Sequence, residues 1–386
     1  MYKKYNIAIA GAGGIGRAVG LLLAENKDLD VKLYIGDIKL ENAQEAATWI
    51  EEGIQLAGLV QPYEMPKEGS NAAMDHVFET CDILLDCLPG SQAPRMASFA
   101  KQNAMHYVNL TEYVKETNDV IEIAKDAETG FILQAGLAPG FINILANQLY
   151  KQFNTQYGVE VVDKIEMKVG ALTDHTRAPH FYGFTWSPIG VATEYVKDAI
   201  AIRDFKKTTL PSLSEPGKII IDGFTFEDNL TSGGAADLPD VFEGKVKDLD
   251  YKTIRYPGHY QWVKETLADI EDSKKVEHIF NEMVKQIPTV EDDIVVIYAS
   301  VVGKDKNGTL RAIEKSYFIK PIYVGTKKLR AIQSTTAAPM AELARMALLE
   351  NWSGPVFQSQ IDPEAFMNGP FVSMVYDGVV KKMSDA

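Results

Sequence analysis

The feature that most constrains the fold is a glycine-rich turn near the N-terminus. Residues 5–10 form an apolar run typical of a buried parallel strand, and residues 15–25 carry apolar side chains at helical spacing. Between them, residues 11–16 read Gly-Ala-Gly-Gly-Ile-Gly, which fits the pattern Gly-x-Gly-x-x-Gly. An acidic residue, Asp37, follows about 20 positions later, and this context is typical of a dinucleotide-binding site.

Each residue of this turn has an expected task. Gly11 permits the tight turn, Gly13 lets the backbone approach a pyrophosphate, and Gly16 lets the helix pack close to the strand. Gly14 and Ile15 begin the helix, whose unpaired N–H groups and positive dipole end favour phosphate. The alternative is a structural turn that binds nothing, and the flanking strand, helix and acidic residue together disfavour it.

The end of the second predicted strand indicates which coenzyme binds. The carboxylate of Asp37 would accept hydrogen bonds from the adenosine ribose hydroxyls and repel a 2′-phosphate, so NAD is favoured. Lys39 lies close enough to keep NADP open as an alternative. Ile38, beside the carboxylate, and Leu88 and Pro89, after a later strand, complete the residues expected to line the cofactor.

Strands and helices alternate over the first third of the chain, which predicts an α/β fold with a parallel, doubly wound sheet. After Gly136 the strands lengthen and alternate polar with apolar residues, and residues 306–308 predict a hairpin turn, so a mostly antiparallel sheet is expected. A last helix, at residues 338–350, is apolar around nearly its whole width and must be buried. The other predicted strands are residues 31–35, 83–88, 106–110, 131–134, 161–169, 218–226, 294–302 and 312–323, and the other helices are residues 41–57, 93–103, 120–128 and 142–150.

Length and composition bound the remaining possibilities. A chain of 386 residues is too long for one small core, so two domains are expected. A net charge of -14 disfavours nucleic acid as a partner. The two cysteines, Cys81 and Cys87, lie in an apolar stretch, as reduced thiols of a cytoplasmic protein do. No apolar stretch reaches the roughly 20 residues of a membrane span, so no membrane partner is expected.

Four short segments of the second half are too unusual to be explained by packing: residues 136–140, 186–190, 231–234 and 250–259. The last of them holds two cations, two phenols and an imidazole around a Pro-Gly turn. Such a density of polar groups is costly unless an anion is bound.

At these residues the sequence resembles the saccharopine dehydrogenase family, in particular the branch that holds saccharopine reductases and lysine 6-dehydrogenases. Ala138 stands where saccharopine reductases tend to carry an acidic residue, so lysine 6-dehydrogenases are the more similar members. The resemblance covers essentially the whole chain, through the glycine turn, Leu88-Pro89, and residues 136–140, 186–188, 252–259 and 335–338.

The resemblance implies a Rossmann domain that is interrupted by an α+β domain. Residues 1–136 and 333–386 would form the dinucleotide-binding domain, and residues 137–332 the substrate-binding and dimerisation domain. A homodimer is therefore the expected assembly. In this family a hydride passes between nicotinamide and the carbon that bears an amine, which gives an imine.

The implied chemistry requires a group that holds the carboxylate of a small amino-acid substrate. Arg255 is the first candidate, because its planar guanidinium binds a carboxylate through two hydrogen bonds. Lys252 and Tyr256 are expected to assist it, and Trp186 and Ser187 to line the substrate site. The alternative is that the cations pair with the many surplus carboxylates of the protein.

The proton-handling group has several candidates, which the sequence does not rank. His259 belongs to the distinctive motif, and a histidine titrates near neutrality. Asp174 lies beside a histidine. Glu112 and Tyr113 follow the strand at residues 106–110, and a doubly wound sheet binds its ligands at the carboxyl ends of its strands.

The sequence predicts an NAD-dependent oxidoreductase that acts on the C–N bond of lysine or a lysine-derived amino acid. The alternatives are a saccharopine- or carboxynorspermidine-type reductase and a non-catalytic interaction protein that senses NAD. No metal is expected, because Pro179 between His175 and His180 breaks the helical face that a two-histidine ligand pair needs. Hydrolase and triphosphatase motifs are absent from the sequence.

Overall fold

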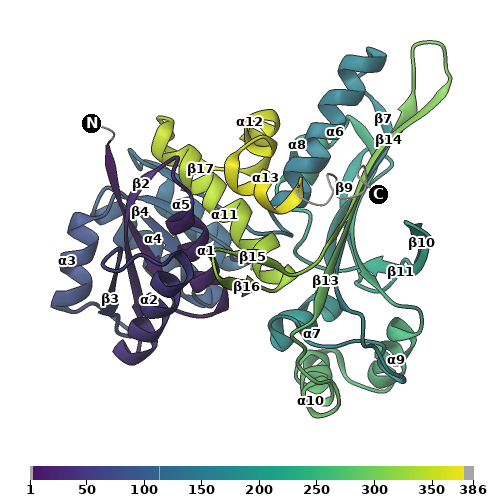
Figure 1. The fold of residues 1–386 in the computed structure, drawn as a ribbon. Coiled ribbons are helices and arrows are strands. Elements are labelled where there is room, and N and C mark those ends of the chain that lie inside the picture. The colour runs from purple at the N-terminus through teal and green to yellow at the C-terminus, as the bar shows by residue number, and fades with distance from the viewer. Residues whose placement is uncertain (1–2, 113, 378–386) are drawn as a thin grey trace. The chain divides into compact units, whose positions relative to one another are not determined.

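The computed structural model describes residues 3–112 and 114–377, and the chain divides into two compact units (Figure 1). The first unit contains Met1–Phe141, Ile322–Leu329 and Gln333–Ala386. The second contains Ile142–Pro321 and Arg330–Ile332. The first unit is thus built from both ends of the chain, and the second is inserted between them.

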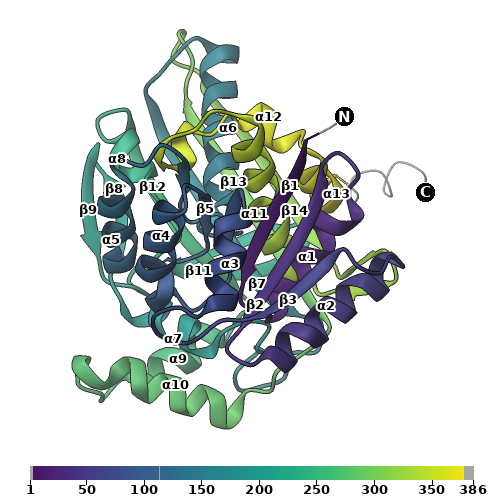
Figure 2. The same cartoon turned by 90° about the vertical axis from the view of Figure 1, so that its left-hand side faces the viewer.

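In the part of the chain that the structure describes, the first unit holds a parallel sheet of seven strands in the order β17-β6-β5-β4-β1-β2-β3 (Figure 2). This confirms the predicted doubly wound sheet. The order in which the chain adds strands to the sheet reverses between β1 and β4, and doubly wound sheets bind their ligands at this point. The strands are β1 (Lys4–Ala10), β2 (Asp30–Asp37), β3 (Val60–Glu64), β4 (Ile83–Asp86), β5 (His106–Asn109), β6 (Gly130–Ile132) and β17 (Gly354–Val356).

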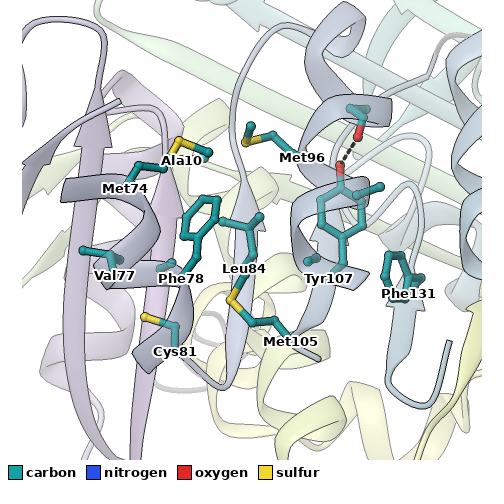
Figure 3. Close-up of a cluster of buried hydrophobic side chains, with 14 of the residues drawn as sticks. Ala10, Met74, Val77, Phe78, Cys81, Leu84, Met96, Met105, Tyr107 and Phe131 are labelled. Atoms are coloured by element: carbon teal, nitrogen blue, oxygen red, sulfur yellow. Dashed lines mark hydrogen bonds between the residues drawn. The ribbon is translucent and has the colours of Figure 1, made fainter. Parts of the chain in front are cut away.

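The helices between these strands supply the apolar side chains that cover the sheet. In one core cluster, Met74, Phe78 and Met96 from the helices pack with Leu84 and Tyr107 from the sheet (Figure 3). All five side chains are almost completely buried, so this cluster fixes α3 and α4 on the strands. The helices are α1 (Gly14–Glu25), α2 (Leu40–Ile54), α3 (Ala72–Thr80), α4 (Ala93–Gln102) and α5 (Val114–Ala124), with a 3-10 turn, η1 (Gly90–Gln92), before α4.

The C-terminal segment returns to the first unit through α11 (Ala331–Leu349), which continues through Pro339 and is buried on nearly all sides. The burial confirms the prediction for an apolar helix, although the helix begins before residue 338. Within it, the buried carboxylate of Glu342 accepts the backbone N–H of Phe371 at 3.0 Å and so ties the last helix to α11. The remaining elements are η3 (Gln358–Gln360), α12 (Pro363–Met367) and α13 (Pro370–Tyr376).

Residues 142–321, all of which the structure describes, contain a mixed sheet of eight strands. The pair β12 and β7 is parallel and the other pairs are antiparallel, and the predicted hairpin turn is confirmed between β13 and β14. The strands are β7 (Val162–Thr173), β8 (Ala199–Arg203), β9 (Lys206–Leu210), β10 (Gly217–Ile221), β11 (Phe224–Leu230), β12 (Val246–Arg255), β13 (Asp293–Lys304) and β14 (Leu310–Ile319). The helices are α6 (Phe141–Tyr157), α7 (Pro188–Val196), α8 (Leu238–Phe242), α9 (His259–Leu267) and α10 (Lys275–Gln286), with η2 (Asp272–Lys274) before α10.

Two predicted strands are wrong in their extent. The strand expected at 218–226 is a hairpin, because Asp222 and Gly223 adopt left-handed conformations with φ of 48° and 82° between β10 and β11. The strand expected at 312–323 ends at Ile319, since Pro321 has no N–H to continue the ladder. A separate strand, β15 (Ile322–Val324), then pairs with β16 (Lys327–Leu329) in the first unit.

A buried carboxyl group lies at the end of β4. Asp86 is 3% exposed, and its Oδ2 accepts the phenol O–H of Tyr107 at 2.6 Å while its Oδ1 accepts the N–H of Leu88 at 3.0 Å. Burial raises the pKa of Asp86 to about 6, although both hydrogen bonds and the charge of Arg95 act in the opposite direction.

This carboxyl makes the stability of the protein depend on pH. Between pH ~4, the pKa of an unfolded Asp, and pH ~6 the folded state binds more protons than the unfolded state, so the free energy of unfolding falls as pH rises through this window. The total loss is about 3 kcal/mol for a pKa difference of about two. Asp86→Asn stays neutral, so we expect it to be more stable than the parent at pH 8 and to lose that advantage near pH 4. Urea titrations of both proteins across this range measure the difference, and a constant difference at all pH values would contradict the assignment.

Candidate functional site

The glycine turn has the geometry of a pyrophosphate cradle. Gly11 has a φ of +105°, and a Cβ on Gly16 would lie 1.9 Å from the carbonyl oxygen of Gly11, so neither position accepts a side chain. Gly13 precedes α1, and a Cβ built on it would meet no protein atom within 4 Å. No side chain caps the start of the helix at Gly14 and Ile15. Open space thus lies before an uncapped helix N-terminus, which favours an anionic group.

The carboxylate of Asp37 is fixed beside this turn. Its Oδ2 accepts the N–H of Ala12 at 3.2 Å, and its Oδ1 accepts the side-chain amide of Asn42 at 3.0 Å and the N–H of Lys39 at 3.3 Å. Ile38 follows it with 54% of its surface exposed, as a residue that lines an adenosine would be. The contribution of Asn42, on the first turn of α2, was missed by the sequence analysis.

Two further side chains contact the backbone of the turn. Arg17 donates from Nε to the carbonyl oxygen of Ala12 at 3.0 Å and is paired with Glu45 at 3.3 Å. Gln333, near the start of α11, donates to the carbonyl oxygen of Gly14 at 3.3 Å. No local sequence signal points to Gln333, because 319 positions separate it from its partner.

Leu88 and Pro89 lie next to the glycine turn, after β4. A Cβ on Gly11 would be 3.0 Å from the carbonyl oxygen of Cys87 and 3.3 Å from a methyl group of Leu88. Pro89 then precedes η1. The structure therefore brings all the residues predicted to bind the cofactor to the carboxyl ends of β1, β2 and β4, within the first unit.

Glu112 is the candidate acid–base group in the same unit. It follows β5 and is half-buried, and burial raises the pKa of its carboxyl to about 7. A carboxyl that titrates near neutrality exchanges protons efficiently at the pH of the cell. The neighbouring candidate Tyr113 lies outside the described residues.

Arg255, the last residue of β12, lies in an aromatic cage of the second unit. It is 1% exposed, and its guanidinium carbon lies 4.7 Å from the ring centre of Tyr182 and 5.5 Å from that of Tyr195. Nε donates to the phenol oxygen of Tyr195 at 2.6 Å, and Nη1 donates to the carbonyl oxygen of Ile254 at 2.9 Å. Among the described residues nothing accepts a hydrogen bond from Nη2.

His259, at the start of α9, is completely buried beside this cage. Nδ1 lies 2.6 Å from the carbonyl oxygen of His180, and Nε2 lies 2.9 Å from the phenol oxygen of Tyr195. Burial, with the charge of Arg255, lowers the pKa of His259 to about 3. The predicted titration near neutrality is therefore wrong, and the structure gives a substrate no free ring nitrogen on this residue.

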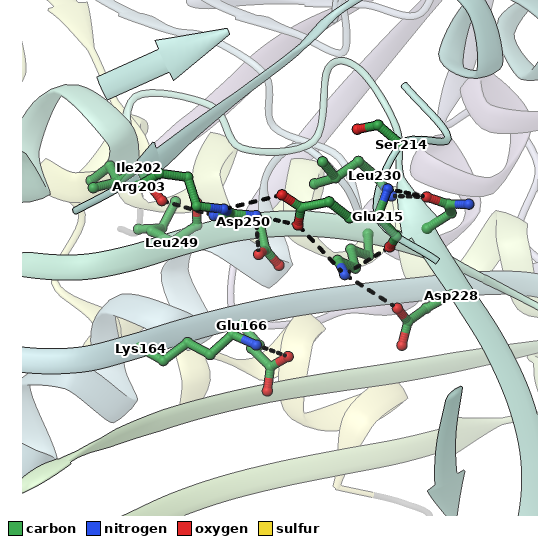
Figure 4. Close-up of polar contacts among 12 residues, drawn as sticks. Lys164, Glu166, Ile202, Arg203, Ser214, Glu215, Asp228, Leu230, Leu249 and Asp250 are labelled. Atoms are coloured by element: carbon green, nitrogen blue, oxygen red, sulfur yellow. Dashed lines mark hydrogen bonds and ion pairs between the residues drawn. The ribbon is translucent and has the colours of Figure 1, made fainter. Parts of the chain in front are cut away.

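Lys252 joins a network of partly buried ion pairs, whose members Arg203, Glu215 and Asp228 are labelled in Figure 4. Its Nζ donates to the carbonyl oxygen of Glu215 at 3.0 Å and lies 3.7 Å from the carboxylate of Asp228, which also pairs with Lys168 at 2.9 Å. Arg203 joins the network by pairing with Glu215 at 2.6 Å. The ammonium group of Lys252 is thus bound by groups of the protein itself. This is the alternative stated for the cations, that they pair with carboxylates of the protein.

Trp186 and Ser187 have roles in the start of α7. Ser187 is the N-cap, and its Oγ accepts the N–H of Gly190 at 3.3 Å. The indole of Trp186 lies against Gly190, because a Cβ there would be 2.4 Å from the ring. Packing and capping therefore account for this segment without a ligand.

The segments at 136–140 and 231–234 are also explained by close approaches of glycine. A Cβ on Gly140 would lie 2.1 Å from the carbonyl oxygen of Gly136, and a Cβ on Gly234 would lie 2.3 Å from the ring of Tyr251. Packing therefore accounts for Gly140 and Gly234 within these two segments.

Tyr256 and Asp174 lie near each other in the second unit. Tyr256 is half-buried, and burial, with the charge of Asp174, raises the pKa of its phenol. Asp174 is exposed in the loop after β7. A carboxylate that water reaches is less suited to proton abstraction than the half-buried Glu112.

Within residues 3–112 and 114–377, no group of three or more His, Cys, Asp and Glu side chains is arranged to hold a metal ion. None of the described helices is both long and apolar enough to span a bilayer. Cys81 and Cys87 are both free thiols.

Two family models together match nearly the whole chain. Residues 7–133 match the saccharopine dehydrogenase NADP binding domain, and residues 136–374 match the saccharopine dehydrogenase C-terminal domain. The chain belongs to the saccharopine dehydrogenase family. The family resemblance predicted from the sequence is confirmed, and the glycine turn lies in the part that matches the family's coenzyme-binding domain.

Two solved structures show the same fold as this family member. Saccharopine dehydrogenase (L-Glu forming) from Saccharomyces cerevisiae, in its apo form, is 14% identical with a TM-score of 0.74, over 96% of this chain and 98% of that chain. Homospermidine synthase from Legionella pneumophila, solved in complex with NAD, is 13% identical with a TM-score of 0.65, over 95% of this chain and 89% of that chain. These two likenesses show that the fold is shared.

The two glycines of the turn separate coenzyme binding from folding. Gly13→Ala adds a methyl group where no protein atom lies, so we expect unchanged thermal stability but at least tenfold weaker NADH binding, because the methyl group occupies the space of the pyrophosphate. Gly16→Ala, the matched variant, should lower both stability and binding, since its Cβ overlaps the carbonyl oxygen of Gly11. Fluorescence titration with NADH and thermal unfolding measure the two effects. Parent-like binding by Gly13→Ala would contradict the placement of the pyrophosphate.

Proposed function

We propose that this protein is an NAD-dependent amino-acid dehydrogenase that acts on the C–N bond of lysine or a lysine-derived amino acid. The observation that carries the proposal is the state of Arg255. This buried cation has no carboxylate of a described residue within 4 Å, and the charge of Glu194 acts on it only from farther away. Because a buried cation that has no carboxylate partner is costly, an anionic ligand is expected at Nη2, which donates no hydrogen bond to a described residue.

Each step of the proposed reaction is assigned to residues of the chain. The glycine turn and Asp37 would hold NAD, which would supply the hydride acceptor for the carbon that bears the amine. Arg255 binds the carboxylate of the amino acid and so fixes its orientation. Glu112 accepts the proton that leaves the ammonium group before the hydride is transferred. The amine-bearing carbon loses a hydride and becomes part of an iminium group, which water then hydrolyses.

The coenzyme proposal rests on the carboxylate of Asp37. It lies beside the turn and would meet a 2′-phosphate with like charge, so NAD is proposed over NADP. The homodimer and the cytoplasmic location inferred from the sequence stay predictions, and sedimentation equilibrium of the pure protein measures the first.

The direct test is turnover. Pure protein is incubated with NAD or NADP and each of L-lysine, saccharopine and polyamine precursors, and the absorbance of the reduced coenzyme is followed. We expect reduction of NAD with L-lysine or a close derivative. Turnover only in the reductive direction, with an amine and a keto acid or semialdehyde, would replace the proposal with a saccharopine- or carboxynorspermidine-type reductase. Coenzyme binding without turnover of any candidate would favour the NAD-sensing alternative.

The pH dependence of turnover tests Glu112. The deprotonated carboxylate is the proton acceptor, so kcat/KM for amine oxidation should rise with pH through about 7 and then level off. Glu112→Gln should lower kcat by ~100-fold or more and abolish the rise of kcat/KM through pH 7. Asp174→Asn changes the other candidate carboxylate and should retain this rise. If kcat/KM of Glu112→Gln still rises through pH 7, another group accepts the proton.

A further inference from the structure

The strongest unassigned arrangement is a chain of hydrogen bonds that ends on Arg255. Its members come from three elements: Arg255 ends β12, His259 begins α9, and Tyr195 lies in α7. All three side chains are at most 2% exposed, so the contacts exclude water. Arg255 and His259 were candidates from the sequence, whereas Tyr195, which joins them, had no signal there.

The direction of each hydrogen bond follows from the chemistry of its last acceptor. The carbonyl oxygen of His180 can only accept, so Nδ1 of His259 carries the proton in the 2.6 Å contact. Nε2 of the neutral ring is then an acceptor, and the phenol O–H of Tyr195 donates to it at 2.9 Å. The phenol oxygen in turn accepts Nε–H of Arg255 at 2.6 Å. Every donor in the chain has an acceptor.

The backbone that carries these side chains is also held in place. Glu227 accepts the N–H of Gly258 at 3.2 Å and the N–H of Tyr260 at 2.7 Å, and so fixes the turn between Arg255 and His259. The ring of Tyr182 packs against both ends of that turn, with its ring centre 4.7 Å from the guanidinium of Arg255 and 5.1 Å from the imidazole of His259.

These contacts use only two of the N–H groups of the guanidinium. An arginine side chain has five N–H groups, and Nε and one N–H of Nη1 are used by Tyr195 and Ile254. The three that remain lie on Nη1 and Nη2. Together they form the fork that binds both oxygens of a carboxylate.

We propose that Tyr195 and His259 are positioning residues that hold the guanidinium of Arg255 in the orientation that captures the substrate carboxylate. Neither residue exchanges a proton with the substrate. The proposal rests on the proposed function, because it takes a carboxylate as the ligand of Arg255. It changes the role of His259 from proton transfer to orientation.

The test compares two buried phenols. Tyr195→Phe keeps the ring and removes the acceptor of Nε, so we expect the KM of the amino acid to rise about tenfold or more, the effect of losing one hydrogen bond to a charged group, with kcat changed less than threefold. Tyr260→Phe is the matched control, since the phenol of Tyr260 is equally buried but donates to the carbonyl oxygen of Thr253. Its KM should stay within threefold of the parent, and both variants should bind NADH as the parent does.

Nitrogen NMR of the histidine rings gives a readout that needs no substrate. The signals of His259 should show the Nδ1–H form and no titration from pH 5 to 8, and the Nε2 signal should shift in Tyr195→Phe. A titrating His259, a Tyr195→Phe variant with a parent-like KM, or one with kcat lowered ~100-fold at unchanged KM would each overturn the inference.

Calorimetric titration with L-lysine and with saccharopine separates this inference from the proposed function. If the parent binds one of these acids and Tyr195→Phe binds it equally well, the positioning role is wrong and the proposed function stands. If the parent binds neither acid and Arg255→Lys does not change this result, both the positioning role and the proposed function are wrong.

Discussion

The structure of the first unit depends on the close approach of α1 to the end of β1. Gly16 lies so near Gly11 that a single added carbon would overlap the carbonyl oxygen. This approach starts the helix directly after the strand and leaves the N–H of Ala12 to bind the carboxylate of Asp37. The helix N-terminus and the carboxylate expected to read the ribose are therefore held by the same short turn, and a coenzyme needs both at once.

One strand of the second unit, β12, carries two buried cations whose surroundings are opposite in kind. Lys252 is surrounded by carboxylates, whereas Arg255 has only phenols and a carbonyl oxygen as its contacts. The cause lies in the strand itself, because successive residues face opposite sides of a sheet and residues three apart lie on opposite faces. The density of cations in the sequence suggested one anion site. The alternation of side chains along the strand, which separates the two cations, was nevertheless already present in the sequence. Only one of the two cations lacks a carboxylate partner among the described residues.

Much of the first unit followed from the sequence, because its βαβ pattern is local. The glycine turn is identified by a strand before it and a helix after it, and both signals lie within a few residues. The strands β3 and β17 were missed, since β17 has three residues and finds its place only by pairing with β6. The pair Asp222-Gly223 is itself a local signal for a two-residue hairpin turn, which the prediction of one strand over residues 218–226 overlooked. The contact of Gln333 with the turn depends on the complete fold and has no local signal.

The identity of the proton-handling group could not follow from residue type, because burial acts in opposite directions on acids and bases. A histidine in water titrates near neutrality and a glutamate does not, but the sequence did not rank His259 above the other candidates. In the folded protein, loss of solvent disfavours the charged form of each. It lowers the pKa of His259 to about 3 and raises that of Glu112 to about 7. The order of the two groups is thereby reversed, and the carboxyl is the one that changes its charge at the pH where the reaction would run.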